Sequence, residues 1–174
     1  MNTTALAANI FSTIGVLLLA YSTFSDKKNN ALLCHAGDSG LNALGNLLVG
    51  SYSAVVTHLI SFIRNLLNAK GKMNKILLGI ITASIVILGL IFNSKGWVGL
   101  LPIIASVEYT IWSSKSKDAQ GLRLALIINM ALWLVHDLMV GLYFVAATDT
   151  IIMILSLVNY IRFETKKAAY KKAA

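Results

Sequence analysis

The sequence is poor in charged residues, proline and cysteine. Only 13% of its 174 residues are charged, which is about half the share of an average soluble domain. The single cysteine, Cys34, excludes an internal disulfide, and no positive charge precedes the first apolar stretch, which argues against a cleaved secretory signal. With 57% hydrophobic residues and a mean hydropathy of +0.74, the chain is predicted to be an integral membrane protein.

Long apolar runs occur seven times and predict an all-α membrane protein with seven transmembrane helices. Each run is close to the roughly 20 residues that a spanning helix needs. The connectors are too short for a soluble domain, so consecutive helices should be antiparallel neighbours in one bundle. The predicted spans are 8–25, 30–50, 52–69, 73–93, 97–114, 120–142 and 147–164.

The 15 Lys and Arg residues are distributed unevenly between the connectors. All except Lys95 follow the first, third, fifth or seventh span or lie at the membrane ends beside those connectors. Because positive charge is retained on the cytoplasmic side, this alternation predicts an outside N-terminus and a cytoplasmic C-terminus. The net charge of +8 borders the spans, so the expected partner is a lipid bilayer with anionic headgroups and not a nucleic acid.

The first three spans recur in the last three, which predicts a 3+1+3 arrangement of two parallel three-helix repeats. The offset between matching segments grows from 88 to 91 to 98, and an odd number of helices per repeat requires a linker helix between them. The predicted units are a first repeat at 1–72, a linker helix at 73–94, a second repeat at 95–165 and a basic cytoplasmic tail at 166–174. The matching segments are Tyr21–Ser25 with Tyr109–Ser113, Leu47–Tyr52 with Leu138–Tyr143, and Ser61–Arg64 with Asn159–Arg162.

Several motifs resemble the YgjV-type family of bacterial inner-membrane proteins over nearly the whole chain. They are Leu48–Tyr52, Ile63–Arg64, Leu100–Ile104, Trp133–Asp137 and Ile161–Phe163. The resemblance implies a multi-pass protein of the bacterial inner (plasma) membrane, distantly similar to the SWEET, PQ-loop and nicotinamide-riboside transporters. It implies no particular substrate. The chain departs from SWEET-type transporters in having one proline, Pro102, and no Pro-Gln pair, so their set of hinge prolines is not carried over.

Polar residues inside the predicted spans are the candidates for a binding site, because such groups are costly in hydrocarbon. Asp38 and Asn129 are related by the offset of 91 and should lie at similar depth. The pair could bind a hydroxylated or amide-bearing solute, with Asp38 available to a cation or a proton. The alternative is an interhelical hydrogen bond that only ties helices together.

Ser61 and Asn159 occupy matching positions in the third helix of each repeat and resemble substrate-lining positions of SWEET-type transporters, so they join the predicted substrate-binding set. Three residues further on, Arg64 and Arg162 are expected to snorkel to the cytoplasmic surface, with attraction of an anion as the alternative.

Glu108, His136 and Asp137 are the candidates for proton or ion coupling. The repeat counterpart of Glu108 is Ala20, and an unmatched carboxylate in a duplicated scaffold suggests an asymmetric role. Its alternative role is to pair with a basic or hydroxyl side chain. Together with His35 and Asp38, His136 and Asp137 could form a zinc site. The expected difference in depth between His35 and His136 is about 15 Å and counts against such a site.

These patterns predict a transporter of a small polar metabolite that works by alternating access between the repeats. No enzymatic activity, cofactor or metal is expected. Two other functions stay open, a membrane scaffold or receptor that does not transport and an intramembrane metal-dependent hydrolase. The sequence leaves the oligomeric state open, including a homo-oligomer.

Overall fold

Seven helices make up most of the described chain in the computed structural model, which confirms the predicted all-α class and helix count. The structure describes residues 3–48, 52–93, 96–140 and 143–173, without the side chains of residues 3–6, 8, 9, 46, 52–54, 137, 140, 143–145 and 168–173. The helices are α1 (Thr3–Ser22), α2 (Lys28–Leu48), α3 (Tyr52–Ala69), α4 (Lys75–Ile91), α5 (Leu100–Lys115), α6 (Ala119–Val140) and α7 (Tyr143–Ala173).

Local sequence signals explain several helix ends. After α3, the amide of Lys72 donates to the carbonyl of Leu67 at 2.9 Å, and Gly71 has a positive φ of 65°. This is a Schellman motif, in which glycine takes the left-handed conformation that other residues avoid. Helix α4 then begins after Asn74, whose side chain accepts the amide of Leu77 at 2.8 Å. The short connector therefore reverses the chain without leaving these backbone groups unpaired.

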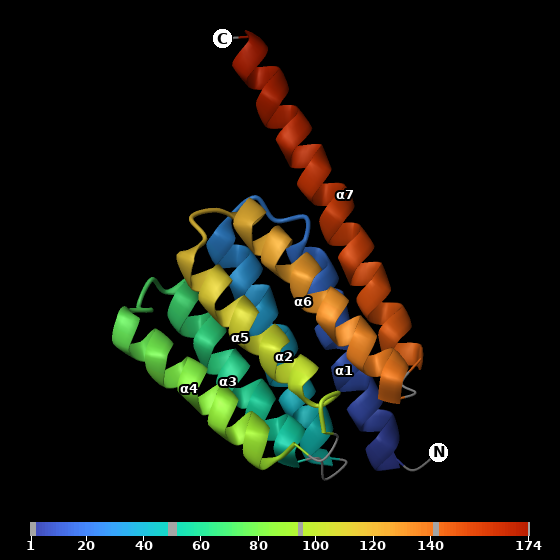
Figure 1. Cartoon of the computed structure of the whole chain (residues 1–174). Coiled ribbons are helices and arrows are strands. Elements are labelled where there is room, and N and C mark those ends of the chain that lie inside the picture. Colours follow the sequence, from blue (N-terminus) through green and yellow to red (C-terminus); the bar gives the residue numbers. More distant parts are fainter. Residues whose placement is uncertain (1–2, 49–51, 94–95, 141–142, 174) are drawn as a thin grey trace.

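Helix α7 departs most from its predicted range. The predicted span ends at residue 164, and the alanines of the basic tail predict a helical extension beyond it; the helix has 31 residues and continues to Ala173. It projects well beyond the rest of the bundle (Figure 1). Alanine and lysine, which dominate its last turns, are strong helix formers, so the helix persists where the apolar sequence stops.

The helices form two groups of three. In the first group α2 lies between α1 and α3, and in the second α6 lies between α5 and α7 (Figure 1). Three contacts join the groups: α2 meets α6, α1 meets α7, and α3 meets α5. Helix α4 packs at the edge, against α3 and α5. The site described below lies where the two groups meet.

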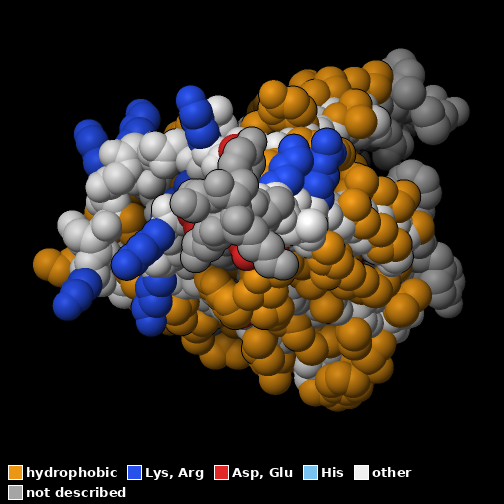
Figure 2. Space-filling view, turned by 90° about the horizontal axis from the view of Figure 1, so that it is seen from above, with side chains coloured by type: hydrophobic (Ala, Val, Ile, Leu, Met, Phe, Trp, Pro, Cys, Tyr) orange, Lys and Arg blue, Asp and Glu red, His pale blue; other side chains and the backbone are white. Residues whose placement is uncertain are grey.

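One end of the bundle carries the α1–α2, α3–α4 and α5–α6 connectors and the projecting part of α7 (Figure 1). We call it the basic end. Viewed from this end, Lys and Arg side chains gather over the connectors, whereas hydrophobic side chains cover much of the lateral surface (Figure 2). Large apolar residues are exposed along several helices, including Leu17, Ile63, Ile76 and Ile161. A soluble monomer rarely exposes apolar surface on this scale, but lipid covers it in a membrane.

Small residues allow α1, α2 and α3 to approach closely. A methyl group added at Gly37 of α2 would lie 2.8 Å from the Leu18 side chain of α1. One added at Gly40 would lie 3.3 Å from Phe62 of α3. These glycines of α2 therefore serve close packing on both sides of the helix, as small residues do in membrane bundles.

Candidate functional site

A buried polar cluster lies where α1, α2, α3 and α5 meet. His35 of α2 is at its centre: its Nε2 lies 2.8 Å from Ser22 Oγ of α1, and its Nδ1 is hydrogen-bonded to the Tyr109 hydroxyl of α5. Ser22 Oγ already donates its proton to the Leu19 carbonyl at 2.6 Å. The pattern is satisfied by a neutral imidazole that donates from Nε2 and accepts from Tyr109 at Nδ1. His35 thus links the two groups of helices. We call Ser22, His35, Arg64, Tyr109 and Thr110 the interior cluster.

Arg64 of α3 contributes a buried cation to the interior cluster. It is only 5% exposed, and its guanidinium donates to Thr110 Oγ1 of α5 at 3.0 Å and to Asn65 Oδ1 at 3.2 Å. The same group lies over the Tyr109 ring, 4.8 Å from its centroid. The expectation that Arg64 snorkels to the surface is therefore wrong. Its side chain turns into the bundle because α5 offers a hydroxyl and an aromatic face there.

Glu108 lies beside this cluster with both carboxylate oxygens buried. Within the described part of the chain neither oxygen has a hydrogen-bond partner. The Arg64 guanidinium is near enough for the two charges to interact. A buried carboxylate without hydrogen bonds is costly, so it marks a place where a proton, water or solute would be stabilising.

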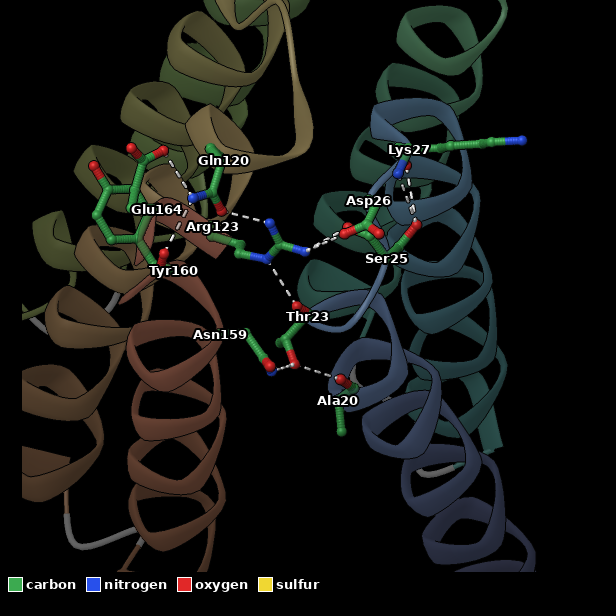
Figure 3. Close-up of polar contacts among 10 residues, drawn as sticks. All are labelled: Ala20, Thr23, Ser25, Asp26, Lys27, Gln120, Arg123, Asn159, Tyr160 and Glu164. Carbon is green, nitrogen blue, oxygen red and sulfur yellow. Dashed lines mark hydrogen bonds and ion pairs between the residues drawn. The ribbon is translucent and has the colours of Figure 1, made fainter. Parts of the chain in front are cut away.

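A second polar cluster lies closer to the basic end and is built around Arg123 of α6 (Figure 3). The Arg123 side chain is buried and donates to the Thr23 carbonyl at 2.8 Å and to the Ser25 carbonyl at 2.5 Å. It also donates to Gln120 Oε1 at 2.5 Å and lies over the Phe163 ring, 4.1 Å from its centroid. Arg123 thus joins α6 and α7 to the α1–α2 connector.

The α5–α6 connector is bound in a similar way from the other group. Lys28, the first residue of α2, donates to the Ser116 carbonyl. Ser25 in the α1–α2 connector accepts from Arg123, and Ser116 in the α5–α6 connector accepts from Lys28. Each group therefore extends a cation from its middle helix to a carbonyl in the connector of the other.

Two threonine hydroxyls complete the contact between the groups. Thr110 of α5 donates to the Ser106 carbonyl at 2.6 Å while accepting from Arg64 of α3. Thr23, at the end of α1, donates to the Ala20 carbonyl at 2.8 Å while accepting from Asn159 of α7 at 3.1 Å. In both cases the third helix of one group donates to a threonine from the first helix of the other, or from the turn that follows it.

Asp38 and Asn129, the predicted substrate-binding pair, each form a hydrogen bond within their own group of helices. Asp38 Oδ1 accepts from Asn42 at 2.8 Å within α2 and faces Gly15 of α1. Asn129 of α6 donates to the Ala105 carbonyl of α5 at 2.8 Å. Each side chain thus lies between the first and second helices of its own group, where it contributes to packing within the group.

The other predicted residues are scattered over the bundle. Asn159 is 2% exposed and bonds to Thr23, whereas Ser61 of α3 is half-buried. His136 of α6 meets the Trp133 ring edge-on with centroids 5.6 Å apart. The Asp137 side chain lies outside the described residues. Among the residues that are described, no group of three or more His, Cys, Asp or Glu side chains could hold a metal ion.

Sequence reasoning missed the main polar contacts between the two groups. His35 was considered only as a zinc ligand, Arg123 only as a topology charge, and Tyr109 only as part of a repeat motif. A signal for Arg64 was present, because five residues separate it from the end of α3, which is about 7.5 Å of helix. At that depth a buried cation needs a polar partner inside the bundle, but the sequence alone does not identify which residue that partner is.

Comparison with protein families gave one match, to the model of the bacterial inner membrane protein family Imp-YgjV, over residues 6–167. Neither the curated proteins nor the solved structures gave a match. In the described chain, Ala119–His136 and Ala146–Lys167 are long and apolar enough to cross a membrane, and Ile10–Ser22 and Lys75–Ile91 are shorter apolar helices. The family and the helices together place the chain in the bacterial inner membrane.

Proposed function

The chain belongs to the Imp-YgjV family of bacterial inner-membrane proteins, and we propose that it transports a small polar metabolite. Transport proceeds by alternating access between the α1–α3 group and the α5–α7 group, with α4 as the linker helix. The basic end faces the cytoplasm and the N-terminus lies outside, in accordance with the retention of positive charge.

The contacts between the groups support two parallel repeats. Exchanging α1 with α5, α2 with α6 and α3 with α7 converts the α1–α7 contact into the α3–α5 contact and leaves the α2–α6 contact in place. This is the pattern that a twofold axis along the membrane normal would produce, and transporters with parallel repeats bind substrate near such an axis. The paired connector cations and paired threonines follow the same exchange.

The observation that carries the proposal is the polar contact surface between the groups. His35 to Tyr109, Arg64 to Thr110 and Asn159 to Thr23 each cross from one group to the other. When the groups separate, such pairs can exchange their hydrogen bonds for water or for a polar solute, whereas separated apolar side chains cannot. A polar contact surface therefore favours a movable boundary that a hydrated substrate can enter.

Within this scheme Glu108 couples transport to a proton or an ion, because its buried carboxylate has no hydrogen-bond partner in the described chain. His136 and Asp137 remain further candidates for coupling. Asp38, Asn129, Ser61 and Asn159 remain the predicted substrate-binding set, and we add Arg64 because its cation lies at the boundary between the groups.

The test begins with a thermal-shift screen of polar metabolites on the purified protein, because a ligand that binds the folded state raises its stability. Uptake of the hit is then measured in proteoliposomes. Arg64→Gln should lower uptake by about 10- to 100-fold, the cost of a lost charged hydrogen bond of about 1.5–3 kcal/mol. Arg162→Gln is the matched control, since Arg162 is the repeat counterpart of Arg64 but is exposed.

Three further variants test movement and the predicted site. In a Cys34→Ser background, a short thiol crosslinker between Thr23→Cys and Asn159→Cys should stop uptake, and reduction should restore it. Asp38→Ala and Asn129→Ala should weaken binding of the hit. Uptake that persists in the crosslinked protein would contradict alternating access. Ligand binding without any uptake would favour the receptor alternative.

A further inference from the structure

A groove of about 610 Å³ runs between α4 and α5 on the outside of the bundle. Where the groove reaches the basic end of the bundle, it is lined by Lys75 and Lys115. The remaining lining includes the apolar side chains of Ala83, Val86 and Ile111. Among the described residues that line it, these two lysines are the only charged ones, and both are exposed. The groove is therefore cationic at one end and mostly apolar along its length, with Thr82 as its uncharged polar residue.

The length of the groove matches one leaflet of a bilayer. Its lining along α4 extends from Lys75 to Ile87, which is about 18 Å of helix. One leaflet of hydrocarbon is about 15 Å thick. An acyl chain with its phosphate at the lysines would thus follow the groove over its whole length.

The electrostatics at the basic end favour an anion. Lys75 opens α4 and Lys115 is the last residue of α5, so two cations from antiparallel helices meet there. The positive end of the α4 dipole and the negative end of the α5 dipole both lie there and offset each other, so the two lysines supply the net positive charge. Basic pockets between transmembrane helices are known sites for lipid phosphate groups.

We propose that this groove binds one anionic phospholipid from the leaflet at the basic end. Its phosphate lies between Lys75 and Lys115 and one acyl chain lies against Ala83, Val86 and Ile111. The proposal does not depend on transport, because neither Lys75 nor Lys115 takes part in the polar contacts between the groups described above.

Gly79 offers a way to block the acyl chain without disturbing the protein. It lines the groove one turn after Lys75, and a methyl group added there would meet no atom within 4 Å. A leucine at this position would project into the open groove. Gly79→Leu should therefore exclude the lipid while leaving helix packing intact.

The experiment measures lipid binding to the purified full-length protein by native mass spectrometry, with phosphatidylglycerol as the probe and phosphatidylcholine as the zwitterionic comparison. The wild type should retain one phosphatidylglycerol at concentrations where phosphatidylcholine does not bind. Lys75→Gln/Lys115→Gln should weaken binding about thirtyfold, since each lysine near an anionic surface contributes about 1 kcal/mol. Gly79→Leu should also lose the lipid.

Lys166→Gln/Lys167→Gln is the control, because it removes the same charge at the basic end outside the groove. Equal loss in this control would show that the lysines attract lipid only through general charge and would overturn the proposal. Normal binding by Gly79→Leu would do the same. A wild-type dimer that Gly79→Leu dissociates would mean that a second copy fills the groove. Melting temperatures measured without added lipid identify any variant that has lost its fold.

Discussion

Replacing Arg123 with methionine is expected to lower the free energy of unfolding by about 3 kcal/mol. Arg123 donates a hydrogen bond to the carbonyl of Thr23, a residue that is only 1% exposed. Losing a charged hydrogen bond to such a buried carbonyl costs about 1.5–3 kcal/mol. The contact with the Phe163 ring adds about 1 kcal/mol. Asp26, 3.9 Å from the guanidinium, is 70% exposed and contributes little because water screens it.

Two measurements report the loss of stability in Arg123→Met. The free energy of unfolding is obtained by titrating micelle-embedded protein with a denaturing detergent while recording tryptophan fluorescence. Hydrogen exchange of residues 23–27 reports on the α1–α2 connector, which should exchange faster when the Arg123 bonds are absent. Arg123→Lys keeps the charge but not the planar fork of donors, so it should recover only part of the stability.

Arg162→Met is the matched control for the change in charge, because Arg162 is exposed on α7. It should change the free energy of unfolding by less than about 0.5 kcal/mol. If Arg123→Met falls within the same limit and leaves hydrogen exchange in the connector unchanged, the reasoning about a buried cation holding the connector is refuted.

Two further predictions concern packing and orientation. A methyl group added at Gly15 would lie 2.9 Å from Asp38 Oδ1, so Gly15→Ala should destabilise the protein by about 1–3 kcal/mol. Gly79→Ala should instead stabilise it by up to about 1 kcal/mol. The same unfolding titration compares the two variants, and equal effects would contradict the close α1–α2 contact. In a Cys34→Ser background, a membrane-impermeant maleimide added to whole cells should label Trp97→Cys but should label Lys117→Cys only after permeabilisation. The reverse pattern would invert the proposed orientation.

The helix count and the approximate range of each helix could be predicted from the sequence, because the length of an apolar run is a local property. Helices α3 and α4, for example, were predicted at 52–69 and 73–93 and are Tyr52–Ala69 and Lys75–Ile91. The length of α7 could not be read from hydropathy, since it follows from the helix propensity of alanine and lysine after the apolar run has ended.

The candidate site was less predictable. The depth of a residue in the membrane follows from its own position in a span, but the direction in which its side chain points depends on how the helices pack. The offset of 91 paired Asp38 of α2 with Asn129 of α6, but the sequence did not predict that each side chain faces the first helix of its own group. The same limitation applies to Arg64. Its burial depends on Tyr109 and Thr110, which are supplied by a helix about 45 residues further along the chain.

If the two groups are repeats, as proposed, the two buried arginines indicate how a duplicated scaffold can acquire one site instead of two. The repeat counterpart of Arg64 is Arg162, which is exposed, and the counterpart of Arg123 at the offset of 91 is Leu32, which is fully buried against Ala69 and Leu122. The first group therefore supplies the interior cation and the second supplies the cation at the basic end. The proposed twofold axis would repeat every charge, and the exchange of roles between these arginines departs from it, so that Arg64 is the cation beside Glu108 within the described chain. In the proposed transporter, a polar solute bound there would meet two different faces, which a symmetric boundary could not offer.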